Sequence, residues 1–64
     1  MIVYTPFWDT LEKKNVSTYK LINKYKISSS TIDRLRHNQP VSTTTLDMLC
    51  KCLDCNVEDI IKYG

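Results

Sequence analysis

The sequence has 64 residues and a net charge of +2, with 42% hydrophobic residues, three cysteines and a single histidine. A chain of this length buries only about 60% of the surface that its unfolded form exposes, so residues 1–64 fit one domain without a separate catalytic or sensing domain. No apolar run approaches the roughly 20 residues that cross a bilayer, and no basic region precedes the apolar start, as it would in a signal peptide. We therefore expect a soluble, cytoplasmic protein with no membrane partner.

One short pattern, present four times, marks where helices begin. In each copy a hydrophobic residue precedes a Ser or Asn, and a second hydrophobic residue follows four positions after it. The polar side chain caps the free N–H groups of the first turn, and the apolar pair forms a hydrophobic staple. The four copies are Val16-Ser17…Leu21, Ile27-Ser28…Ile32, Val41-Ser42…Leu46 and Cys55-Asn56…Ile60. A fifth start is Thr5 followed by Pro6, because proline is tolerated at the first helical position.

These starts predict five helices with short connections. The helices are expected at residues 6–14, 18–24, 29–37, 43–53 and 57–63. Apolar residues recur at helical spacing within them, and such short connections require neighbouring helices to pack together. The predicted fold class is therefore all-α, a compact five-helix domain. The opening Ile2-Val3-Tyr4 is β-prone, so it is a candidate N-terminal β-strand that pairs either with the end of the chain or with a partner molecule.

The three cysteines form a C-x-C-x2-C pattern at Cys50, Cys52 and Cys55. An odd number of cysteines without a secretory signal argues against a disulfide framework. A metal site would need a fourth ligand, and the one histidine, His37, is distant in sequence. Cys50 falls on the inner stripe of its helix and Cys55 occupies a staple position, where a free cysteine serves as a small buried hydrophobe. We therefore expect structural cysteines, with no metal and no other cofactor.

Basic residues gather in the middle of the chain. Between Lys13 and Arg36 there are seven of them against one acid, Asp33, whereas residues 41–64 carry two basic and four acidic residues. This distribution is either chance variation of a solvated surface or a basic face that attracts phosphate. The caps Ser17 and Ser28 stand eleven residues apart, a spacing suited to two short helices in a helix-turn-helix at about residues 17–38.

The stretch from Val16 to Val41, VSTYKLINKYKISSSTIDRLRHNQPV, resembles the helix-turn-helix of the Cro and phage-repressor (XRE) family. Almost the whole chain is similar to the short stand-alone bacterial members. The resemblance implies a lambda-repressor-like domain and a transcriptional regulator, a repressor by expectation, which binds a specific sequence of double-stranded DNA. Its recognition helix, at about residues 29–37, would lie in the major groove. Ile22 and Lys26 depart from the family, which has a small residue and a glycine there, so we expect Lys26 to need a left-handed conformation.

The resemblance also implies which side chains touch DNA. The guanidinium of Arg34 matches the two acceptors of guanine, and the N-terminus of the helix at 18–24 attracts a phosphate. The expected base contacts are Ser29, Ser30, Thr31 and Arg34. The expected phosphate contacts are Thr18, Lys20, Asn23, Arg36, His37, Asn38, Gln39 and Thr43. For Arg34 and the serines, the alternative is an exposed side chain that serves only its own helix.

No set of catalytic side chains is recognisable. His37 has neither a nucleophile nor a paired carboxylate near it in sequence, and no glycine-rich phosphate loop is present, so we expect no enzyme and no small-molecule substrate. Double-stranded DNA is the expected partner, and a homodimer would read two half-sites about one helical turn apart. The alternative function is a protein-interaction module, such as an antitoxin-like accessory subunit, whose main partner is another protein.

Overall fold

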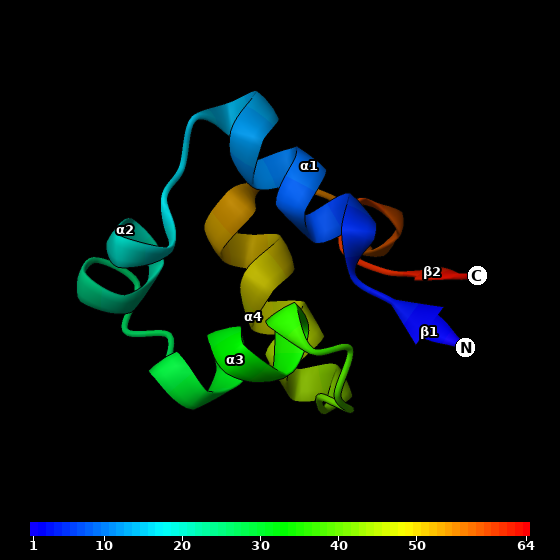
Figure 1. Ribbon diagram of the computed structural model, residues 1–64. Helices are drawn as coiled ribbons and strands as arrows, with labels where there is room; N and C mark the ends of the chain where they lie inside the picture. Colours follow the sequence, from blue (N-terminus) through cyan, green and yellow to red (C-terminus); the bar gives the residue numbers. More distant parts are fainter.

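The computed structural model describes all 64 residues and is mostly helical. In chain order its elements are β1 (Ile2–Val3), α1 (Thr5–Lys14), α2 (Thr18–Asn23), α3 (Ser29–Arg36), α4 (Thr43–Leu53), the 3-10 turn η1 (Val57–Asp59) and β2 (Lys62–Tyr63). Helix α4 runs through the middle of the view in Figure 1, with α1 towards the top and α3 in front of the lower part of α4. No helix has the length and apolar character that crossing a bilayer requires.

Serine caps begin α2, α3 and α4, as the sequence predicts. The side chains of Ser17, Ser28 and Ser42 each accept a hydrogen bond from the backbone N–H three residues later, at 3.1, 3.2 and 3.1 Å respectively. Helix α1 differs slightly from the expectation, because Thr5 is its first residue and no side chain caps it. Pro6 lies in its first turn, where its missing N–H costs nothing.

The fifth predicted helix is wrong. Residues 57–63 form only the turn η1, and the chain then becomes extended as β2. A helix of two turns is marginal by itself, whereas the extended end of the chain gains ladder hydrogen bonds with β1. Ile2 pairs with Tyr63 and Val3 with Lys62 in antiparallel register. The β-prone start of the chain therefore pairs with the chain's own end, which is one of the two arrangements that the sequence left open.

The two ends of the chain and the end of α3 are tied together by hydrogen bonds. The N-terminal ammonium of Met1 donates to the carbonyl of Gly64 at 2.7 Å. The backbone N–H of Tyr4 donates to Oδ1 of Asn38 at 3.2 Å, and the Tyr4 hydroxyl donates to the Gln39 carbonyl at 2.7 Å. Tyr4 is itself buried, so it fixes the C-terminal end of α3 against the start of α1.

A single apolar core joins every helix. Its most buried side chains are Phe7, Leu21, Leu35, Leu49 and Ile60, which come from α1, α2, α3, α4 and the residue that follows η1. Because each helix inserts at least one side chain that is fully removed from water, the polar faces of α2 and α3 are held in fixed positions relative to one another.

Two residues that follow the short helices α2 and α3 have a left-handed backbone conformation. Lys26, in the connection between α2 and α3, has a φ of 61°, which confirms the expectation for this position. Asn38, just after α3, has a φ of 55°. Asn adopts this conformation readily, whereas a lysine there is strained by about 1–2 kcal/mol.

Candidate nucleic-acid interface

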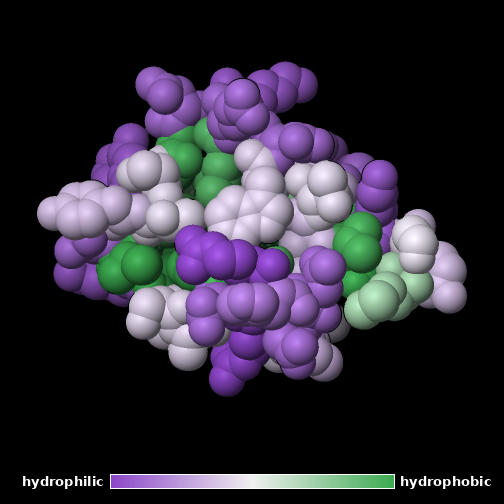
Figure 2. All heavy atoms as spheres, viewed as in Figure 1, coloured by the Kyte–Doolittle hydropathy of each residue, from purple (hydrophilic) through white to green (hydrophobic).

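Helix α3 divides into an apolar and a polar face. Ile32 and Leu35 are buried in the core, and Ser29, Ser30 and Arg34 are exposed. Helical spacing therefore directs these three expected base-contact residues away from the core. Figure 2 shows hydrophilic side chains covering the region of α3, with apolar side chains reaching the surface on either side of it.

Thr31, the fourth expected base contact, is placed differently. It is half-buried, and its hydroxyl lies 2.8 Å from the hydroxyl of the cap Ser28. The Thr31 side chain therefore takes part in the hydrogen bonding at the N-terminus of α3.

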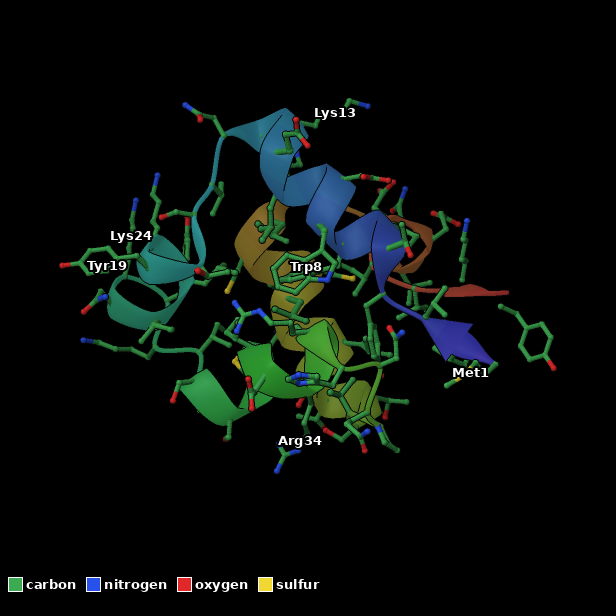
Figure 3. All side chains as sticks on the ribbon, in the orientation of Figure 1. Met1, Trp8, Lys13, Tyr19, Lys24 and Arg34 are labelled. Atoms are coloured by element: carbon green, nitrogen blue, oxygen red, sulfur yellow. The ribbon has the colours of Figure 1, made fainter.

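Arg34 has no partner within the chain. The three salt bridges of the protein involve other basic residues, and the Arg34 side chain points away from the body of the molecule in Figure 3. Two positions later, Arg36 is held instead. Its Nη1 lies 3.7 Å from Asp33, and its guanidinium lies over the ring of Trp8 on α1, 5.6 Å from the ring centre. Arg36, and not Arg34, therefore makes the salt bridge within α3.

A shallow groove of about 340 Å³ lies between α2 and α3. It is lined by Thr18, Ile22, Ser29, Ser30, Ile32, Asp33 and Arg36. It therefore brings the first residue of α2 together with the first turn of α3, and joins expected phosphate and base contacts in one surface.

The expected phosphate contacts form two groups around α3. Thr18, Lys20 and Asn23 lie on α2. In this group the N–H of Lys20 is already bonded to the Ser17 cap, and the side-chain amide of Asn23 donates to the Tyr19 carbonyl at 2.9 Å.

The second group follows the C-terminal end of α3. Arg36 ends the helix, His37, Asn38 and Gln39 come next, and Thr43 begins α4. His37 places its Nδ1 2.9 Å from the Asp33 carbonyl. The side-chain oxygen of Asn38 accepts a hydrogen bond from the backbone N–H of Tyr4. Asn38 therefore also stabilises the fold.

Two exposed side chains near this surface were not among the expected contacts. Asp33 lies on α3 and is 65% exposed; its spacing of three and four residues from Ser30 and Ser29 is the signal that could have identified it. Tyr19, on α2, is 75% exposed. It projects on the same side of the molecule as Lys24 (Figure 3).

The cysteines lie on α4 and in the segment that follows it. All three are free, half-buried and packed against the core. The backbone N–H of Cys55 donates to the carbonyl of Cys50 at 3.1 Å, around Asp54 in left-handed conformation, which is a common way to end a helix. Burial, together with neighbouring Cys50 and Asp59, raises the pKa of the Cys55 thiol to about 11. No group of three or more His, Cys, Asp or Glu side chains forms a metal-binding cluster.

Comparison with known proteins gives two matches. Residues 7–64 match the family model of the Cro/C1-type helix-turn-helix (HTH) DNA-binding domain. The structure is similar to the crystal structure of the transcriptional regulator VanUg (form II), with a TM-score of 0.86 and 31% sequence identity over 95% of this chain and 81% of that chain. A comparison with curated proteins gives no significant match.

Proposed function

The chain belongs to the Cro/C1-type helix-turn-helix DNA-binding family, and we propose that it is a sequence-specific repressor that lays α3 in the major groove of double-stranded DNA. The B-form major groove, about 12 Å wide, admits a helix. The observation that carries the proposal is the polar face of α3. On this face Arg34 is exposed and makes no salt bridge. The short side chains of Ser29 and Ser30 are exposed on the same helix.

Arg34 is the principal base-reading residue in this proposal. A guanidinium donates two hydrogen bonds to O6 and N7 of guanine, a pair that discriminates against other bases by about 1–3 kcal/mol. Ser29 and Ser30 lie one turn earlier and carry small hydroxyl side chains, which let the start of α3 approach the base edges closely. Thr31 belongs to this set through its position, although its hydroxyl faces Ser28.

The two groups of phosphate contacts flank α3 and set its orientation. The first turn of α2, with Thr18 and Lys20, holds a phosphate on one side. His37, Gln39 and Thr43 hold the backbone on the other side. Such contacts position the protein without reading sequence.

Repression follows from occupancy alone. A domain of this size covers the DNA around its site and prevents another protein from binding there. We propose that the protein acts as a homodimer on a two-fold symmetric site, because two half-sites separated by about one helical turn match two copies of α3. Exposed apolar side chains at the chain ends, Met1, Ile2 and Tyr63, would supply the contact between the copies.

Fluorescence anisotropy with labelled duplexes tests the proposal. The wild-type protein should bind a duplex obtained by selection more tightly than a scrambled duplex, and its affinity should fall steeply with salt as counterions are released. Arg34→Ala should lose most of the difference between the two duplexes. Lys20→Ala should weaken both about equally. A protein that binds neither duplex at about 50 mM salt would contradict the proposal and favour a protein-interaction module.

A further inference from the structure

Asp33 is the acidic side chain on the polar face of α3. It lies about one turn after Ser29 and Ser30, and it lines the same groove as both serines. Its side chain is 65% exposed. A carboxylate therefore stands inside the surface that we propose to face a polyanion.

The hydrogen-bonding capacity of this carboxylate is largely unused. One carboxylate oxygen lies 3.7 Å from Nη1 of Arg36 and 4.0 Å from Nδ1 of His37, distances that are long for hydrogen bonds. Arg36 also faces the ring of Trp8. The two basic groups reduce the local negative charge, but both carboxylate oxygens can still accept a hydrogen bond from a donor outside the chain.

The major groove offers few such donors. Phosphate oxygens, O6 and N7 of guanine and O4 of thymine are all acceptors, which a carboxylate repels. The donors are the amino groups of cytosine (N4) and adenine (N6). In adenine the amino group lies beside the acceptor N7, whereas the N4 group of cytosine is the usual partner of Asp and Glu.

We propose that Asp33 determines specificity by accepting a hydrogen bond from N4 of a cytosine and by disfavouring guanine and thymine at that position. The inference rests on the proposed function. The Cα atoms of Asp33 and Arg34 are about 3.8 Å apart, and successive base pairs are about 3.4 Å apart. We therefore expect the cytosine in a base pair next to the one whose guanine Arg34 reads.

Selection of bound duplexes from a random library tests this assignment. The proteins compared are the wild type, Asp33→Ala, Asp33→Asn, Arg36→Ala and Asp47→Ala. Asp47 is a matched control on α4. Like Asp33 it is an exposed helical aspartate, and it makes a salt bridge of 3.6 Å to Lys51. The wild type should enrich a cytosine at a position directly next to the base pair whose guanine Arg34 reads. Asp33→Ala should lose about tenfold discrimination at that position alone.

The two other substitutions sharpen the result. Asp33→Asn should shift the preference at the same position towards adenine, because an amide pairs with N6 and N7 of adenine. Asp47→Ala should leave every position unchanged. Circular dichroism of each variant verifies that it is folded, and the near-isosteric Asp33→Asn keeps the comparison valid if Asp33→Ala is unstable.

Three outcomes would overturn the inference. If Asp33→Ala and the wild type select the same sequences, Asp33 reads no base, although the proposed function stands. If Arg36→Ala changes the same position in the same way, Asp33 acts only by holding Arg36. If the wild type enriches no sequence at all, the proposed function fails and the inference fails with it.

Discussion

The guanidinium of Arg36 lies over the ring of Trp8, with 5.6 Å between its central carbon and the ring centre. The two residues come from α3 and α1, so this contact joins the C-terminal end of α3 to the first helix of the core. Trp8 also packs edge-on against Phe7, with 4.9 Å between the ring centres, and Phe7 is fully buried. Arg36 is therefore committed to the protein, whereas Arg34 is free for a ligand.

A double-mutant cycle of Trp8 and Arg36 should show coupling. An exposed cation–π pair contributes about 0.5–1 kcal/mol, so we expect a coupling energy in that range when Trp8→Ala, Arg36→Ala and the double variant are unfolded in urea. Additive effects of the two substitutions would contradict the contact. Arg36→Ala should also reduce DNA affinity less than Arg34→Ala does, because Arg36 is already engaged.

Removal of the cap of α3 should destabilise the protein and weaken DNA binding together. Ser28 accepts the N–H of Thr31 at 3.2 Å, and loss of such a cap costs about 1 kcal/mol. Thermal unfolding of Ser28→Ala should report this loss. Ser42→Ala is the matched control, since it removes the cap of α4 at a similar cost. If both variants bound DNA equally well at a temperature where both are folded, the start of α3 would have no special role in binding.

Replacement of Lys26 by glycine should stabilise the protein. The left-handed conformation at Lys26 (φ 61°) strains a residue that has a Cβ by about 1–2 kcal/mol, and glycine adopts it freely, although its flexible unfolded state offsets part of the gain. We expect a net increase of up to about 1 kcal/mol in the free energy of unfolding. Lys24→Gly is the control. Lys24 has right-handed helical geometry, so glycine there should destabilise by up to about 1 kcal/mol.

Stability should fall at alkaline pH through Cys55. Its pKa is raised from 9.0 to about 11 in the folded protein, chiefly by burial. The unfolded chain therefore loses the thiol proton at a lower pH than the folded chain does. The stabilising contribution of the protonated Cys55 thiol is complete below pH 9 and is lost as the pH rises towards 11. Denaturant unfolding of the wild type and Cys55→Ala at pH 8 and pH 10.5 measures this effect. The wild type should lose more stability than the variant, and equal losses would refute it.

Local signals in the sequence predicted the helix-turn-helix well. The caps Ser17, Ser28 and Ser42 act within three residues of themselves, so α2, α3 and α4 begin where the sequence places them. The left-handed conformation of Lys26 was expected from the family resemblance, because the family has a glycine at this place in the turn. The exposed face of α3 followed from helical spacing around Ile32 and Leu35.

Long-range pairing was the part that local signals could not decide. The staple at Cys55 and Asn56 indicated a helix, but Lys62 and Tyr63 pair with residues at the other end of the chain, and this pairing outweighs a marginal second turn. The Tyr4 bond to Gln39 and the Trp8 contact with Arg36 likewise join residues that are distant in sequence. Asp33 was not among the expected contacts although its spacing from Ser29 and Ser30 places it on the same side of the helix, and the structure adds the groove that the three residues share.

The most direct test of the account is a map of the DNA-bound surface by nuclear magnetic resonance. Uniformly 15N-labelled protein would be titrated with a selected duplex and, as control, with a scrambled one. We predict that the largest amide shift changes specific to the selected duplex lie at Ser29–Arg36 in α3, with changes common to both duplexes in the first turn of α2. The largest changes at the α1–η1 face or around Cys50 and Cys55, with α3 unaffected, would contradict it.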